Sequence, residues 1–145
     1  MTSRDSVEYV QKEHLEIARL AEKIADALAL ASKEDFQSRQ QGLAGLRAVR
    51  EGLLGVLQHC HAEEGILESD FHHYLDGKQY ERLRTQHRSI ARTTAGLLRE
   101  LPYMTADFVA DLCGPGRELL EELREHIAFE QDMLWRVEDR RLQYQ

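Results

Sequence analysis

The sequence predicts an all-α fold, an antiparallel up-down-up-down four-helix bundle formed by one domain over residues 1–145. Only two prolines and nine glycines occur, and Ala, Leu, Glu, Arg and Gln are abundant, as in helical proteins. Apolar residues recur at spacings of three and four in four segments, with turn-forming residues between them. Short connections favour antiparallel neighbours, and a chain of this length can bury a core without cross-links.

The first predicted helix has an apolar stripe that a histidine interrupts. The apolar members of this stripe are Val7, Val10, Ile17, Ala21, Ile24 and Leu28. His14 occupies the intervening position, where a single buried face calls for an apolar residue. It lies near the middle of the helix only if the helix begins near Ser3. In the following segment "ASKEDF", Ser32 and Asp35 are alternative N-caps of the second helix.

The second and third predicted helices also carry polar residues at stripe positions. The second stripe contains Leu46, Val49, Leu53, Val56, His59, Glu63 and Ile66. The third contains Tyr80, Leu83, His87, Ile90, Thr94, Leu97 and Leu101. Asp76, directly before Gly77, is the expected N-cap of the third helix, and the segment around Pro102 ends it.

The fourth predicted helix contains a proline and two polar stripe residues. Its stripe consists of Val109, Leu112, Gly116, Leu119, Leu123, His126, Glu130, Met133 and Val137. Pro115 falls within "CGPG", and a proline inside a helix costs about 3 kcal/mol and kinks or ends it. Because the spacing continues from Leu112 to Leu119, we predict a kinked but continuous helix.

Four histidines and two glutamates therefore fall at predicted core positions, in the order H, HxxxE, H, HxxxE. They are His14, His59, Glu63, His87, His126 and Glu130. Each unsatisfied buried polar group costs about 1–3 kcal/mol. Neutral imidazole binds iron, zinc, copper and nickel, and carboxylates can hold two cations about 3.5–4 Å apart. A lone core histidine is commonly just hydrogen-bonded, and one HxxxE is an ordinary surface pair, but the joint pattern predicts two metal ions.

The other histidines, the cysteine beside His59 and two aromatic residues have simpler interpretations. His61 lies about 200° round the helix from His59, so the two cannot both face inward. His72 and His73 are expected on the surface, and Tyr80 and Trp135, about one to two turns from the polar residues, are expected to cap the core rather than to contact a cofactor. Cys60 is either a small packed residue or a redox-active thiol.

Charge and cysteine usage restrict the partners and the compartment. The chain has 19 Lys and Arg against 26 Asp and Glu, a net charge of −7 with both signs interleaved, which argues against nucleic acid as a partner. Cys60 and Cys113 form no CxxC pair, which suits a reducing compartment. The N-terminal residues lack the apolar run of a signal peptide, and charges interrupt every longer apolar segment. We expect a cytoplasmic protein that does not enter the membrane.

The order of these residues resembles the hemerythrin-like, or HHE cation-binding, domain family. The resemblance rests on His14, "HCHAE" from His59 to Glu63, "QHRSI" around His87 and "HIAFE" from His126 to Glu130, and it covers nearly the whole chain. It implies a non-haem di-iron centre in a four-helix bundle, with two histidines per iron and both glutamates bridging. Ferritin-like di-iron proteins differ, because their Glu and ExxH motifs make a carboxylate-rich site.

The sequence departs from the oxygen-carrying hemerythrins on the third helix. Those proteins have a second histidine one turn from the third-helix ligand, whereas Leu83 and Ala91 stand one turn either side of His87 here. The resemblance then implies an open position on both ions. Such a position favours peroxide, superoxide or nitric oxide chemistry over reversible oxygen carriage.

Three functions remain open at this point. The chain can be a module that binds or senses oxygen or nitric oxide, an oxidoreductase that decomposes peroxide, or a protein that handles iron or repairs iron centres. All three share a di-iron centre that binds or reacts with oxygen, peroxide or nitric oxide, and this is the function we predict. Zinc or manganese can occupy the same ligands in recombinant material.

Overall fold

The computed structural model describes residues 3–66 and 75–143, and every regular element in these two ranges is helical. The α-helices are α1 (Ser3–Ala31), α2 (Phe36–Ala48), α3 (Arg50–Ile66), α4 (Gly77–Glu100) and α5 (Cys113–Gln143). Two short 3₁₀ helices, η2 (Leu101–Tyr103) and η3 (Val109–Leu112), connect α4 to α5. The prediction of an all-α protein is confirmed.

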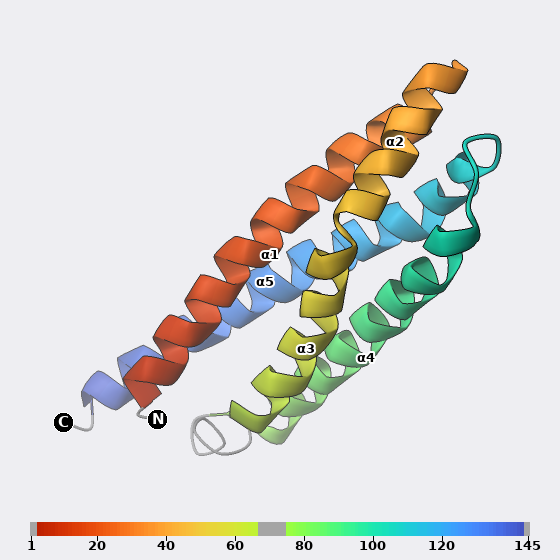
Figure 1. The fold of residues 1–145 in the computed structure, drawn as a ribbon. Helices are drawn as coiled ribbons and strands as arrows, with labels where there is room; N and C mark the ends of the chain where they lie inside the picture. The colour runs from red at the N-terminus through yellow and green to blue at the C-terminus, as the bar shows by residue number, and fades with distance from the viewer. Residues whose placement is uncertain (1–2, 67–74, 144–145) are drawn as a thin grey trace.

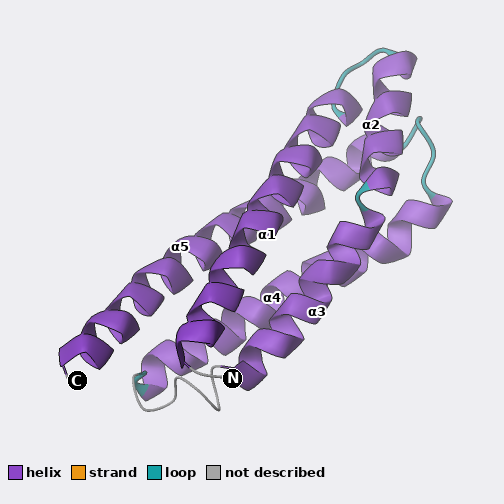
Figure 2. Ribbon diagram, turned by 60° about the vertical axis from the view of Figure 1, so that its left-hand side comes forward, coloured by secondary structure: helices purple, strands orange, loops and turns teal. Residues whose placement is uncertain are grey.

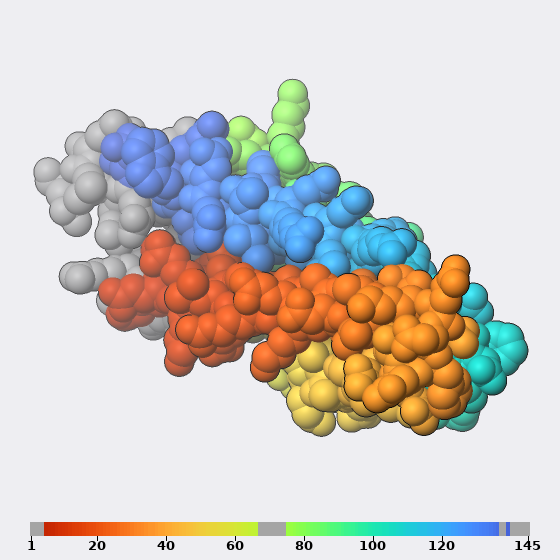
Figure 3. Space-filling view, turned by 90° about the horizontal axis from the view of Figure 1, so that it is seen from above, coloured from red at the N-terminus to blue at the C-terminus, as the bar shows by residue number. Residues whose placement is uncertain are grey.

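The long helices lie side by side around a common interior. Helix α1 contacts α2, α3 and α5, while α4 contacts α3 and α5. The start of α1 and the end of α5 lie at the same end of the molecule, and α2 and α3 follow one another along its length (Figures 1 and 2). Figure 3 shows α1, in red, and α5, in blue, side by side along the molecule, with α2, in orange, against the far part of α1.

The predicted helix starts have the expected chemistry. Asp35 accepts a hydrogen bond from the backbone N–H of Ser38 at 2.8 Å and caps α2, which decides between the two N-caps left open by the sequence. Asp76 accepts from the backbone N–H of Gln79, whose side chain accepts from the backbone N–H of Asp76 in return. This capping box fixes the start of α4.

The second predicted helix is divided into α2 and α3 at Val49. The backbone N–H of Val49 bonds to Leu46 O, the tighter pattern in which a helix commonly ends, and α3 begins at the next residue. Gly42 brings α2 very close to α1, since a Cβ at this position would lie 2.4 Å from the backbone nitrogen of Ala31. The turn at Val49 lets α3 change direction after this close approach (Figure 1).

The sequence predicted one kinked fourth helix, but the structure has a short 3₁₀ helix followed by a separate α-helix. Residues 109–112 form η3, and α5 begins at Cys113, so Pro115 lies in the first turn of α5. In that turn a missing backbone N–H breaks no intrahelical bond, and proline is well tolerated. The apolar register nevertheless continues as predicted, because Val109, Leu112 and Leu119 are all buried.

Two apolar clusters occupy the interior, and a layer of buried polar residues separates them. The larger cluster includes Ile17, Val56, Ile90 and Leu123. The smaller consists of Val7, Val10, Leu83, Met133 and Leu134. Helices α1 and α4 run from the smaller cluster to the larger one, whereas α5 runs the opposite way. Neighbouring helices α4 and α5 are therefore antiparallel across the polar layer.

Candidate metal centre

The polar layer contains all six residues that the sequence predicts as metal ligands. Each is at most 3% exposed: His14 on α1, His59 and Glu63 on α3, His87 on α4, and His126 and Glu130 on α5. The helix spacing explains why His59 and Glu63 on α3, and His126 and Glu130 on α5, point to the same side, because residues four apart on one helix are neighbours on one face. Because α1 begins at Ser3, His14 also reaches this layer, as the sequence required.

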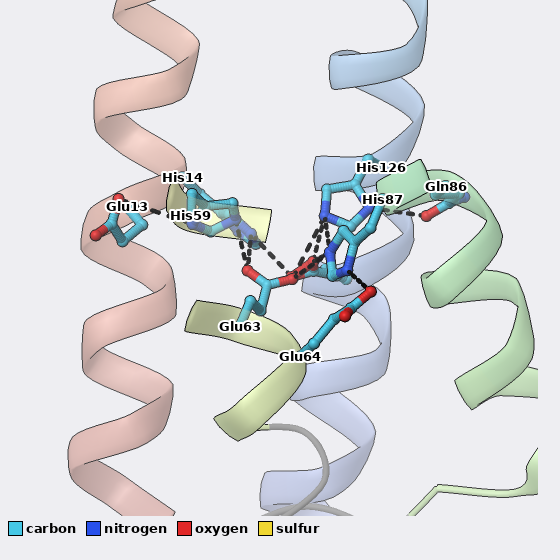
Figure 4. A network of polar contacts seen from close by, with 9 residues as sticks. Glu13, His14, His59, Glu63, Glu64, Gln86, His87 and His126 are labelled. Carbon is cyan, nitrogen blue, oxygen red and sulfur yellow. Dashed lines mark hydrogen bonds and ion pairs between the residues drawn. The ribbon is translucent and has the colours of Figure 1, made fainter. Parts of the chain in front are cut away.

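Glu63 directs one carboxylate oxygen toward each pair of histidines. Its Oε2 lies 2.6 Å from His59 Nε2, while its Oε1 lies 3.1 Å from His87 Nε2 and 3.4 Å from His126 Nε2. Figure 4 shows the carboxylate between the imidazoles of His14 and His59 on one side and those of His87 and His126 on the other.

Glu130 has the corresponding arrangement from the opposite helix. Its Oε2 lies 2.5 Å from His126 Nε2 and 3.9 Å from His87 Nε2, and its Oε1 lies 3.2 Å from His14 Nε2. Each glutamate thus has one oxygen directed to each pair of histidines, an arrangement in which a carboxylate can bridge two cations.

Two overlapping groups of four ligand atoms follow from this arrangement. In each group the atoms lie within 4.8 Å of one another, and both groups are fully buried. The groups are His14, His59, Glu63 and Glu130, and Glu63, His87, His126 and Glu130. These buried His and Glu residues could hold a metal ion.

Several of these close contacts are not hydrogen bonds. Within the described part of the chain, Nε2 of His59 and the Oε2 atoms of Glu63 and Glu130 have no hydrogen-bond partner. Nevertheless, His59 Nε2 lies 2.6 Å from Glu63 Oε2, and Glu130 Oε2 lies 2.5 Å from His126 Nε2. Buried polar atoms left in this state cost about 1–3 kcal/mol each. The donor set of imidazole nitrogens and carboxylate oxygens, directed at common points, fits divalent first-row cations.

The electrostatics of the layer favour positive charge. Burial by itself would lower the pKa of His87, but the contacts with the carboxylates of Glu130 and Glu63 outweigh it and raise this pKa to about 10. The same opposition raises the pKa of His126 to about 9. Burial would raise the pKa of Glu63, yet its contacts with Glu130 and the histidines hold it well below its usual range. Without cations, protons on the imidazoles balance the carboxylates.

Residues outside the six contact the outer nitrogens of three histidines. Gln86 Oε1 accepts a hydrogen bond from His126 Nδ1 at 2.8 Å. Glu64 Oε1 lies 3.5 Å from His87 Nδ1, and Glu13 Oε2 lies 3.7 Å from His59 Nδ1 (Figure 4). None of these three residues was predicted from the sequence. All three adjoin a predicted ligand in sequence, but each reaches a histidine on another helix, and helix periodicity does not report such contacts.

The remaining sequence interpretations have mixed outcomes. His61 is exposed as predicted, and Tyr80 is half-buried against the smaller apolar cluster. Trp135 was expected in the core but is 67% exposed, because its position on α5 turns away from the neighbouring buried residue Leu134. His72 and His73 lie outside the described residues.

Both cysteines are free and buried. For Cys60, burial and then the charge of Glu63 raise the thiol pKa to about 12, so the thiol is protonated at neutral pH and is a weak nucleophile. This favours the packed residue over the redox-active thiol, the two interpretations that the sequence left open.

Comparison with known proteins yields no relative for this chain: no family model, no curated protein and no solved structure matches it. In the described residues, no helix combines the length and apolar character needed to cross a membrane.

Proposed function

We propose that the chain is a hemerythrin-like protein whose helices form an antiparallel four-helix bundle around a non-haem di-iron centre. The ligands would be His14 and His59 for one ion, and His87 and His126 for the other, with both glutamates bridging. One observation carries the proposal: each buried carboxylate directs one oxygen to each pair of histidines.

The resemblance in ligand order supports iron as the metal. Imidazole and carboxylate also suit zinc, manganese and copper, so the ligands alone do not select the ion. Iron in such a centre supplies reversible electron exchange with oxygen, peroxide or nitric oxide. The protein's own contribution is to hold the ligands at fixed positions and to exclude water, which the apolar clusters on both sides of the polar layer do.

Peroxide decomposition is the second candidate function, and the surroundings of His87 favour it. Leu83, one turn before His87, is fully buried in the smaller apolar cluster, and Ala91, one turn after it, has no metal-binding group. The protein would thus offer two histidines per ion and no third one from α4, so a coordination position would stay open for a small exogenous ligand. An oxidoreductase needs such an open position so that peroxide can bind, react and leave in each turnover. A carrier or sensor instead needs its bound gas to stay bound for a long time.

Metal analysis combined with an optical spectrum tests the di-iron proposal. We expect two irons per chain and the near-ultraviolet and visible absorption of an oxo-bridged ferric pair in the air-oxidised protein. His126→Ala removes one ligand and Glu130→Ala removes a bridge, so either variant is expected to retain one ion or fewer. His61→Ala is the matched control, because this histidine is exposed and outside the layer. Two ions retained in both ligand variants would refute the assignment.

A further inference from the structure

The four histidines of the candidate centre differ in the hydrogen bonding of Nδ1, the ring nitrogen that faces away from the centre. His126 Nδ1 donates a hydrogen bond of 2.8 Å to Gln86. The Nδ1 atoms of His14, His59 and His87 have no hydrogen-bond partner within residues 3–66 and 75–143. Glu64 Oε1 lies 3.5 Å from His87 Nδ1 and Glu13 Oε2 lies 3.7 Å from His59 Nδ1, and neither contact is a hydrogen bond. The pair formed by His87 and His126 therefore has a hydrogen bond to an outer nitrogen, and the pair formed by His14 and His59 has none.

The hydrogen bond from His126 to Gln86 has a chemical consequence at the centre. A neutral imidazole that carries its proton on Nδ1 presents its lone pair at Nε2, and His126 Nε2 is the atom that faces Glu63 and Glu130. The bond to Gln86 selects this tautomer, fixes the ring and raises its basicity. Outer partners of this kind typically change metal affinity by about 10–100-fold.

The distance between the two rings also differs between the pairs, and it again favours the pair formed by His87 and His126. His87 Nε2 and His126 Nε2 lie 3.2 Å apart, and their ring centroids are separated by 4.6 Å. Two nitrogens at about 2.1 Å from one ion lie about 3.0–3.4 Å apart when they are adjacent ligands. The ring centroids of His14 and His59 are 5.8 Å apart. The first pair is thus closer to the arrangement that one ion requires.

The glutamates do not offset this difference, because they serve both pairs. Glu63 and Glu130 belong to both groups of ligand atoms, so their charge attracts a cation to either half. A difference in affinity between the halves must come from the histidines and from the residues that orient them.

We propose that the two halves of the centre bind divalent cations unequally, with Gln86 as the positioning residue that makes the His87 and His126 half the tighter one. This inference rests on the proposed two-metal function. The first ion occupies the half anchored by Gln86, and the ion held by His14 and His59 is the exchangeable one. A protein with one ion per chain is then a defined species rather than a mixture.

Gln86 can be changed without disturbing the core. It is half-buried and lines a surface hollow of about 150 Å³ between α4 and α5, together with Thr85, Ser89, Glu122 and Glu125. Gln86→Met has similar length and no acceptor oxygen, whereas Gln86→Glu retains one. Gln131→Met makes the same substitution at an exposed position of α5 and is the matched control.

Calorimetric titration of the metal-free protein with Co²⁺ measures the two affinities. We expect two separate steps in the unmodified protein, with dissociation constants that differ by about 10–100-fold. Gln86→Met should weaken the tighter step by a similar factor and leave the other unchanged. Gln86→Glu and Gln131→Met should keep both steps.

Proton NMR at one equivalent of Co²⁺ tests directly whether Gln86 holds the ring of His126. A loss of stability alone would not change this signal. The Nδ1–H of His126 should give a shifted resonance that exchanges slowly with water in the unmodified protein and in Gln86→Glu, and rapidly in Gln86→Met. Two ions bound with equal affinity, or both steps weakened alike by Gln86→Met, would overturn the inequality and leave the two-metal proposal intact. Fewer than two ions bound by the unmodified protein would refute both.

Discussion

The interior contains two kinds of layer that are equally buried and energetically opposite. Leu119, in the larger apolar cluster, and Glu63, in the polar layer, are both 0% exposed. Burial of Leu119 contributes about 1.5–3 kcal/mol to folding, whereas burial of Glu63 is favourable only if positive charge accompanies it. The comparison teaches that the apolar layers stabilise the fold by themselves, while the polar layer depends on what binds there.

Removal of metal should have the largest effect, and it should act through the polar layer alone. Ions that bind the folded chain but not the unfolded one stabilise it by about 4 kcal/mol per site when the free ion is about 1,000-fold above its dissociation constant. We expect chelation to lower the melting temperature clearly, as measured by calorimetry before and after metal removal. An unchanged melting curve would mean that protons and hydrogen bonds already satisfy the layer.

Gly42→Ala tests the apolar side of the comparison. The added Cβ would lie 2.4 Å from Ala31 N and 2.7 Å from Ala27 O, and these are backbone atoms that cannot move without displacing α1. We expect a loss of about 1–3 kcal/mol in the free energy of unfolding, measured by chemical denaturation, with unchanged metal content. Gly55→Ala is the control, because a Cβ there meets nothing within 4 Å, and it should stabilise α3 slightly. Loss of metal in Gly42→Ala would show that the two layers are coupled.

The pH dependence of the metal-free protein should differ from that of the loaded protein. The raised pKa values of His87 and His126, about 10 and about 9, contribute stability below about pH 6.5 that is lost as the pH rises through these values. The lowered pKa of Glu63 contributes stability above about pH 4.5 that is lost on acidification. The metal-free protein should therefore be most stable in mildly acidic solution.

Bound metal should reverse this trend on the alkaline side, because ions would displace the protons from the imidazoles. The difference in melting temperature between loaded and metal-free protein should widen from pH 6 to pH 9. Thermal scans of both forms across this range measure it. A constant difference would indicate that the imidazoles are not the groups that bind the ions.

Ala91→His should have the smallest effect, confined to reactivity. A histidine one turn beyond His87 lies on the same side of α4 and could occupy the coordination position proposed for a small ligand. We expect slower consumption of added peroxide by the ferric protein in stopped-flow measurements, with little change in stability. Arg92→His, at an exposed neighbouring position, is the control. If the unmodified protein consumes no peroxide, the carrier or sensor function is favoured over the enzyme.

The helices and the six polar residues could be predicted because both depend on periodicity. Spacings of three and four placed His14, His59, His87 and His126 on buried faces, and each of them is buried. The break at Val49 and the position of Pro115 in the first turn of α5 were missed. The apolar spacing continues through both points, so periodicity gives no sign of where one helix ends and the next begins.

The sequence by itself determined which side chains enter the interior, because a helix fixes the direction of every residue relative to its neighbours three and four positions away. The tertiary structure alone decided which atoms meet there. It divides the oxygens of Glu63 and Glu130 between two pairs of histidines, and it places Gln86 on the outer nitrogen of His126. These contacts join helices that are distant in sequence, and their distances are set by how closely the helices pack, which no local pattern encodes.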